Sequence, residues 1–172
     1  SLSTLFGGSS NEDVLSSIIG LFTRSLRSGL PVDIIRSNQI SELQTNTTTF
    51  SRPLITGMLI NNKDANIIGN KLFKFRNSGT GINPYPVIEG ILVMNMDGGM
   101  LANNMIAIDN DGLSNSIHIL GIKQSTAGLT STNYFYNTIA ISGSGGEGVS
   151  IDYYRNYSNP SAPGGTMRNN IF

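Results

Sequence analysis

Several residue types that build common functional sites are absent or rare in this chain of 172 residues. It has no cysteine, which excludes disulfides, thiolate metal sites and a cysteine nucleophile. Its 11 Lys and Arg balance 11 Asp and Glu, and only 13% of the residues are charged, so it lacks the basic excess of a nucleic-acid-binding protein. No stretch reaches the roughly 18 consecutive apolar residues that a membrane-spanning helix requires. We therefore expect neither a nucleic-acid partner nor a membrane span.

Turn-forming residues are abundant instead, and they alternate with a strong strand former. The chain has 20 Gly and 20 Asn, a level typical of disorder, but it also has 21 Ile. Isoleucine at this level, separated by turn residues, is typical of many short strands.

An internal repeat organises these residues. The motif Asn-x-aliphatic recurs with spacings of 32, 34, 33 and 32 residues, at Asn38, Asn70, Asn104, Asn137 and Asn169. A second motif, Ile-x-Gly-aliphatic, recurs upstream of these asparagines, with its glycine at Gly20, Gly57, Gly90 and Gly121. A repeat of this length cannot bury its apolar face alone and does so by stacking on its neighbours. The aliphatic residues two after each Asn then form a column, which places Ile40, Leu72, Ile106, Ile139 and Ile171 in the core.

The asparagines are interpreted as structural corners rather than ligand contacts. Asparagine tolerates the left-handed backbone conformation, and its amide can both donate to and accept from the amides of the coils above and below. We therefore expect an asparagine ladder along one edge of the stack.

The repeat resembles the right-handed parallel β-helix of pectate-lyase-like folds, in particular the long secreted surface proteins of Bacteroidota-type bacteria. The matching segments are GNKLF (69–73), ANNMIAI (102–108), YFYNTIAISGSGG (134–146) and GGTMRNNIF (164–172). The resemblance implies an all-β, right-handed parallel β-helix solenoid and a secreted or cell-surface setting. It implies no particular activity.

The fold prediction is a single β-helix segment over residues 1–172, with about five coils of roughly 33 residues. Both ends fall near a corner, so we expect an excerpt of a longer solenoid whose ends continue in a parent protein. Residues 13–28 leave two alternatives, a strand in phase with the glycine motif or an amphipathic helix that caps the coil end. The strand is favoured because Ile18-Ile-Gly20-Leu fits the repeat.

The acidic residues offer weak catalytic and metal candidates. Asp64 and Asp97 each lie seven residues after a repeat glycine, and Arg27 does so one coil earlier, so the two carboxylates could stack as in a retaining glycosidase. Asp109 and Asp111 have a spacing found in calcium loops but lack the distal glutamate. We therefore expect no cofactor, with calcium as the alternative. His118, the only histidine, has no recognisable catalytic partner in the sequence.

Tyrosines supply the binding candidates. One sequence region holds a set of rings and one guanidinium that could gather on a single face: Tyr134, Tyr136, Tyr153, Tyr154, Arg155 and Tyr157. Aromatic faces beside amides and arginine suit contacts with sugars or proteins. The alternative is that Tyr134 belongs to the core.

Three functional interpretations remain open. The chain is a non-catalytic structural or adhesive segment whose surface contacts glycans or other surface and secretion proteins. Alternatively, it is a polysaccharide-binding or polysaccharide-degrading β-helix, acting as a lyase or glycosidase. In the third interpretation it is a fragment whose role depends on other domains. Release of products from polysaccharides would distinguish the second from the first.

Overall fold

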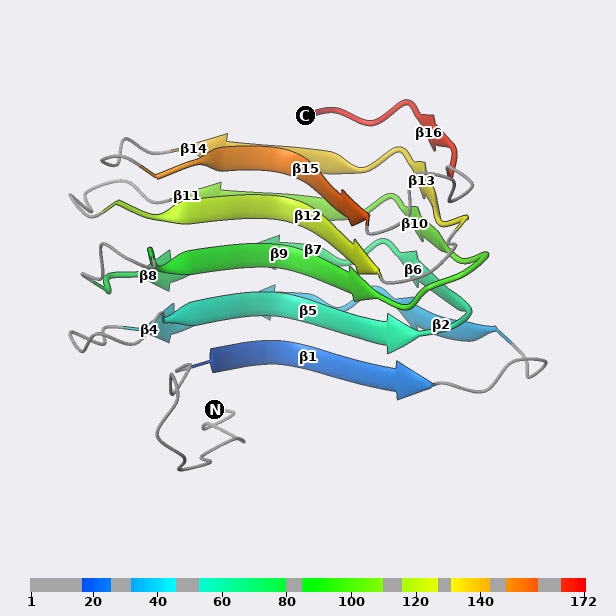
Figure 1. Cartoon of the computed structure of the whole chain (residues 1–172), viewed down its shortest axis with the longest axis horizontal. Coiled ribbons are helices and arrows are strands. Elements are labelled where there is room, and N and C mark those ends of the chain that lie inside the picture. The colour runs from blue at the N-terminus through cyan, green and yellow to red at the C-terminus, as the bar shows by residue number, and fades with distance from the viewer. Residues whose placement is uncertain are drawn as a thin grey trace.

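The computed structural model describes residues 17–25, 32–45, 53–79, 85–109, 116–126, 131–142, 148–157 and 165–172. Within these ranges every regular element is a β-strand, and every strand pair is parallel (Figure 1). The predicted all-β parallel solenoid is confirmed. No helix in the described part of the chain is long and apolar enough to cross a membrane.

The strands form four sheets, and each sheet collects one strand from successive coils. The first and longest sheet contains β1 (Ser17–Ser25), β5 (Leu54–Asn62), β9 (Val87–Met94), β12 (His118–Thr126) and β15 (Ser150–Tyr157). The second contains β2 (Asp33–Arg36), β6 (Ala65–Ile68), β10 (Met100–Ala102), β13 (Asn133–Phe135) and β16 (Met167–Arg168). The third contains β3 (Gln39–Ser41), β7 (Lys71–Phe73), β11 (Met105–Asp109) and β14 (Thr138–Ser142). A fourth pairs β4 (Gln44–Thr45) with β8 (Arg76–Asn77).

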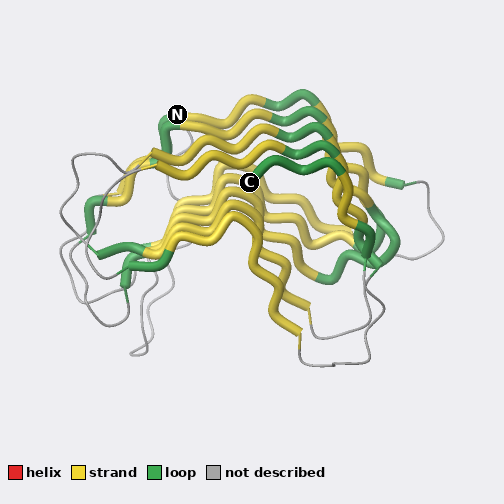
Figure 2. Tube along the Cα trace, turned by 90° about the horizontal axis from the view of Figure 1, so that it is seen from above, coloured by secondary structure: helices red, strands yellow, loops and turns green. Residues whose placement is uncertain are grey.

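Successive coils lie directly above one another. Viewed down the stack, their strands overlay, and the strands of the first sheet are bent near their middle (Figure 2). The described strands complete fewer turns than the five predicted. The last coil contributes β15 and the two-residue β16, but in the described residues it adds only an isolated bridge, Thr138 to Ile171, beside the third sheet.

The segment 13–28 is a strand where it is described, and the helix alternative is wrong there. Residues 17–25 form β1, which pairs with β5 over its whole length, from Ser17 beside Leu54 to Ser25 beside Asn62. Long-range pairing outweighs the helical spacing of the apolar residues because the strand places Leu21 against the core of the next coil. Residues 13–16 and 26–28 lie outside the described part.

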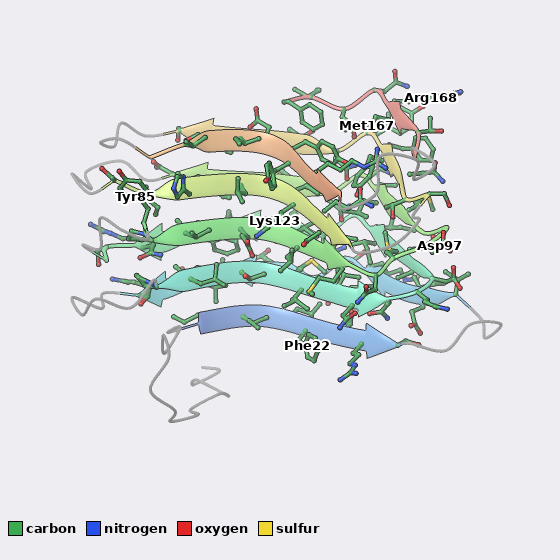
Figure 3. The ribbon with its side chains drawn as sticks, viewed as in Figure 1. Phe22, Tyr85, Asp97, Lys123, Met167 and Arg168 are labelled. Atoms are coloured by element: carbon green, nitrogen blue, oxygen red, sulfur yellow. The ribbon has the colours of Figure 1, made fainter. Side chains whose placement is uncertain are left out.

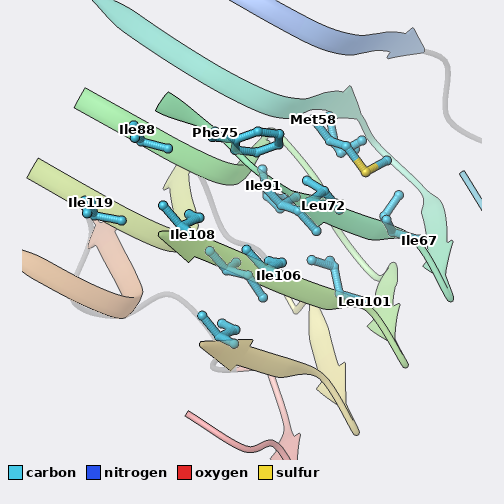
Figure 4. Close-up of a cluster of buried hydrophobic side chains, with 14 of the residues drawn as sticks. Met58, Ile67, Leu72, Phe75, Ile88, Ile91, Leu101, Ile106, Ile108 and Ile119 are labelled. Atoms are coloured by element: carbon cyan, nitrogen blue, oxygen red, sulfur yellow. The ribbon is translucent and has the colours of Figure 1, made fainter. Parts of the chain in front are cut away.

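The core consists of aliphatic columns that run along the stack (Figure 4). One column joins Ile40, Leu72, Ile106 and Ile139 on the third sheet. It faces a second column on the first sheet, formed by Leu21, Met58, Ile91, Ile122 and Tyr153. Each coil thus completes the apolar surface of its neighbours, as the repeat predicts.

The repeat glycines lie where side chains of the third sheet pack directly against the main chain of the first. An ideal Cβ on Gly57 would lie 2.6 Å from Leu72 Cδ2, 2.6 Å from the Gly90 carbonyl and 2.7 Å from Phe75 Cε2. Gly20 and Gly121 are confined in the same way, each with an isoleucine Cγ2 of the third sheet at 2.5 Å. Glycine is therefore required here by space, since no side chain fits between the sheets.

A ladder of asparagine side chains runs along one edge of the stack. The Oδ1 atom of Asn104 accepts from the main-chain N–H of Asn70 at 3.0 Å and from its Nδ2 at 2.9 Å. The Nδ2 of Asn104 donates to Ile67 O and to Asn137 Oδ1, both at 2.9 Å. The same pattern links Asn38 to Asn70. Each side-chain amide inside the ladder therefore forms hydrogen bonds with the coil before it and the coil after it, and no charged group is needed.

The last rung of the ladder is Asn170, so the prediction of Asn169 is wrong by one residue. Asn137 donates its main-chain N–H and its Nδ2 to Asn170 Oδ1, at 2.9 and 3.0 Å. The motif was misaligned because Ile171 matched the Asn-x-aliphatic pattern. In the structure Ile171 pairs with Thr138, an outward position, and 66% of it is exposed. Ile171 therefore does not extend the aliphatic column.

The left-handed residue at each corner is the one before the ladder asparagine, not the asparagine itself. These residues have φ between 53° and 65°, namely Ser37, Gly69, Asn103, Tyr136 and Asn169. The asparagines are selected for hydrogen bonding, whereas the residues before them carry the turn.

Candidate functional site

The predicted tyrosine face does not exist as one surface. Tyr134 is only 2% exposed and Tyr153 packs against the core, with their rings in edge-to-face contact at 5.1 Å. Tyr136 is 58% exposed at a corner, and Tyr154 lies on the outer face of β15. Tyr157 is the last residue of β15. Alternation along the strands sends neighbouring tyrosines to opposite sides, which sequence proximity does not reveal.

The buried tyrosines belong to a polar network inside the last coils. The hydroxyls of Tyr134 and Tyr153 both donate to Gln124 Oε1, at 2.9 and 3.0 Å. Gln124 Nε2 in turn donates to Thr132 Oγ1 at 3.4 Å. Arg155 aligns with Gln124 on the neighbouring strand, so it also takes an inward position. Tyr134, Gln124 and Thr132 are at most 2% exposed, so these three side chains are not available to a ligand, whereas Tyr153 and Arg155 are partly exposed.

Burial raises the pKa of Tyr134 well above its usual value and also raises the pKa of Tyr153. A raised phenol pKa means that the folded state holds the proton more tightly than the unfolded state does. The neutral phenol therefore contributes its full share to the free energy of unfolding below pH about 10, and this contribution is lost as the pH rises further. We expect Tyr134→Phe to lower the free energy of unfolding by about 1 kcal/mol at neutral pH. We also expect a smaller further loss between pH 9 and pH 11 than in the wild type.

Urea unfolding at several pH values tests this expectation. Tyr136→Phe is the matched control, because the Tyr136 ring is exposed at a corner. An unchanged alkaline loss in Tyr134→Phe would show that Tyr134 does not carry it.

Asp97 lies beside the Lys63–Asp64 segment of the preceding coil, as the register of the predicted carboxylate pair requires, and the catalytic role of the pair stays a prediction. Ile60 pairs with Val93, and Asn66 pairs with Met100. Val93 and Met100 are seven residues apart, but Ile60 and Asn66 are only six apart, so the third coil has one residue more than the second in this segment. Asp97 donates its N–H to Lys63 O at 2.6 Å and accepts from Ser131 Oγ at 3.4 Å. Asp64 Oδ1 lies near Gly98, 3.4 Å from the place that a Cβ would take there. Arg27 lies outside the described residues.

The calcium candidate is described only in part. Asp109 ends β11 beside Ser142 and is exposed, whereas Asp111 lies outside the described part. No group of three or more metal-ligating side chains occurs among the described residues. The calcium site thus remains a prediction without a described ligand set.

His118 is held by local contacts on the first sheet. Its ring meets the Tyr85 ring edge-on at 5.0 Å, and its Nδ1 accepts the N–H of Val149 at 3.3 Å. This hydrogen bond leaves the Nδ1 atom as an acceptor, so the neutral ring carries its proton on Nε2.

A buried ion pair on the outer face of the first sheet was not found from the sequence. Glu89 Oε1 lies 2.7 Å from Lys123 Nζ, and Thr56 Oγ1 donates to Glu89 Oε2 at 3.0 Å. All three side chains point outward, because Ile88 and Ile122 point into the core. The Glu89 side chain is nevertheless only 3% exposed and that of Lys123 26% exposed. Lys123 lies well away from Asp97 on the surface (Figure 3).

A second outer site was also not found from the sequence, a pocket of about 540 Å³ beside the third and fourth sheets. Its lining includes Phe73, four charged side chains and the small residue Ala107. The charged residues are Glu42, Lys74, Arg76 and Asp109. Two of them pair across neighbouring coils, because Lys74 Nζ lies 3.5 Å from Glu42 Oε1.

Comparisons with known proteins add no family. No protein-family model, curated protein sequence or solved structure matches this chain. The functional argument therefore depends on the two outer sites and on the fold.

Proposed function

We propose that this chain is a rigid, non-catalytic β-solenoid segment of a secreted or cell-surface protein and that its outer surface binds glycans. The observation that carries the proposal is the pocket beside Phe73. Its lining combines this aromatic ring with Arg76 and Asp109 on strands and with Glu42 and Lys74 at the corners between strands. Sites placed on strands are held more precisely than sites on loops. The secreted or cell-surface setting rests on the resemblance of the repeat segments alone.

The scaffold supports this role through its stiffness. The asparagine ladder and the aliphatic columns connect every coil to the next through side chains as well as through the main chain. A body of this kind holds a surface site in a fixed orientation and loses little conformational entropy on binding.

A polysaccharide panel tests the proposal. The chain is immobilised, neutral and acidic polysaccharides are passed over it, and both retention and the release of reducing or unsaturated ends are measured. Retention without release supports the proposal. Release of products contradicts a non-catalytic role. If the immobilised chain retains none of the polysaccharides, glycan binding is contradicted.

The second candidate function is polysaccharide cleavage, and the Glu89 cluster is the observation that favours it. A carboxylate with a lysine at 2.7 Å, on the outer face of a sheet, has the components of an acid–base pair. If products are released, Glu89→Gln is expected to lower the rate about 100-fold or more. Asp97→Asn is the matched control, because Asp97 is the acid predicted from the sequence and lies away from Lys123. Equal rates in wild type and Glu89→Gln would exclude Glu89 from the chemistry.

A further inference from the structure

Two phenylalanines line the pocket, the fully buried Phe75 and the partly exposed Phe73, whose neighbours along the stack are small. Phe73 pairs with Ser41 on one side and with Ala107 on the other, and the next residue of this outer column is Ala140. The inward columns, by contrast, stack large aliphatic residues against one another. The ring of Phe73 is therefore not sandwiched by large side chains of the adjacent strands. Lys74 Nζ lies over the ring, 6.0 Å from its centroid, so a flat apolar group has room on the ring face that Lys74 does not cover.

The charged side chains of the pocket balance in number and differ in hydrogen-bonding character. Glu42 and Asp109 carry negative charges, whereas Lys74 and Arg76 carry positive ones. Carboxylates only accept hydrogen bonds, and ammonium and guanidinium groups only donate them. Glu42 and Lys74 also form an exposed pair at 3.5 Å, so each partly neutralises the field of the other.

This combination selects a class of ligand. A charged ligand would gain from two of the four groups and be repelled by the other two. A hydroxyl group, however, both donates and accepts, so a ligand rich in hydroxyls can bond with all four. The apolar face of such a ligand can lie on Phe73, and the volume of about 540 Å³ lies within the range of small-molecule sites.

We propose that this pocket binds a neutral sugar ring, with one ring face on Phe73 and the hydroxyls directed to Glu42, Lys74, Arg76 and Asp109. The inference rests on the proposed glycan-binding function and narrows it to neutral rather than acidic sugars. It also assigns the contact to the third and fourth sheets rather than to the tyrosines or to the outer face of the first sheet.

Isothermal titration with neutral hexasaccharides of glucose and mannose, and with an oligogalacturonate of the same length, tests the proposal. We expect at least one neutral hexasaccharide to bind and the oligogalacturonate to bind more weakly. Phe73→Ala is expected to weaken the neutral ligand at least about tenfold through loss of the apolar contact. Phe22→Ala is the matched control, because Phe22 is an exposed ring on β1, in a different sheet.

A second variant keeps Phe73 in place. Ala107→Leu puts a larger side chain beside the ring inside the pocket and is expected to weaken binding to a similar degree. Ala140→Leu makes the same change one coil further in the same outer column, where the residue is exposed, and is expected to bind as the wild type does. Thermal unfolding shows whether each variant is folded.

Each outcome decides a different point. If a neutral sugar binds and neither Phe73→Ala nor Ala107→Leu changes its affinity, the proposed pocket is wrong but the proposed glycan-binding function stands. Stronger binding of the oligogalacturonate overturns the choice of a neutral ligand. Failure of every sugar to bind overturns both the pocket and the proposed function.

Discussion

Replacing Asn104 by alanine is expected to lower the free energy of unfolding by about 4 kcal/mol. Asn104 is 1% exposed, and its side chain makes four hydrogen bonds, two accepted from Asn70 and two donated to Ile67 O and Asn137 Oδ1. The substitution removes all four hydrogen bonds and leaves the Asn70 main-chain N–H without its acceptor, whereas Asn70 Nδ2 keeps Ile35 O and Asn137 Oδ1 keeps the main-chain N–H of residue 104. A buried group left unsatisfied costs about 1–3 kcal/mol, and each further lost hydrogen bond about 1 kcal/mol. Urea unfolding followed by far-UV circular dichroism measures the change.

Two further variants show whether the ladder is the cause. Asn104→Asp keeps an acceptor but loses the donor, and it also buries a charge, so it is expected to be at least as destabilising as alanine. Asn103→Ala changes the exposed neighbour with φ 55° and is expected to cost only about 1 kcal/mol, the cost of a left-handed conformation. Equal losses in Asn103→Ala and Asn104→Ala would contradict a ladder that stabilises the fold.

Gly57→Ala is expected to cost about 3 kcal/mol, a large effect for a single methyl group. The new Cβ would lie 2.6 Å from Leu72 Cδ2 and 2.6 Å from the main-chain carbonyl of Gly90. The leucine side chain can shift, but the Gly90 carbonyl belongs to the neighbouring strand β9 of the same sheet, so β5 and β9 must move apart locally. Thermal and urea unfolding of the variant measure the loss.

Gly69→Ala provides the comparison for Gly57→Ala. Gly69 has φ +65°, and an ideal Cβ there meets no atom within 4 Å. Its cost is therefore conformational only, about 1 kcal/mol. If both substitutions cost the same, the close approach of the first and third sheets at the repeat glycines is incorrect.

The sequence predicts the stack well because the repeat encodes it directly. The glycine motif places Gly57 beside Gly90 in the structure, as the pairing of Thr56 with Glu89 and Met58 with Ile91 requires. The error at Asn169 has a simple origin, since two consecutive asparagines fit the motif and only pairing with the previous coil selects Asn170. The spacing of the motif determines the length of the repeat, but it does not determine which of the two consecutive asparagines, Asn169 or Asn170, joins the ladder.

The outer sites were harder to predict because they depend on insertions and on which face a side chain takes. One additional residue lies between Val93 and Met100, and Asp97 accepts a hydrogen bond from Ser131 of the next coil, neither of which the spacing of Asp64 and Asp97 indicates. The Phe73 site was nonetheless encoded in the repeat. Residues 32 before and 34 after Phe73 are Ser41 and Ala107, so reading each outward column for a large ring between small neighbours would have found it.

The parallel coil register is the central claim, and an engineered disulfide tests it most directly. The chain has no cysteine, so a pair introduced at Lys71 and Met105 can react only with each other within one molecule. The two residues are exposed and pair across β7 and β11, where adjacent strands lie about 4.8 Å apart, within the span of a disulfide. Mass spectrometry of digested, mildly oxidised protein should show the linked peptides from Lys71→Cys/Met105→Cys. The pair Lys71→Cys/Ala107→Cys is offset by two residues along the strand and should stay reduced, whereas equal linkage in the two variants, or linkage only in the offset pair, would contradict the register.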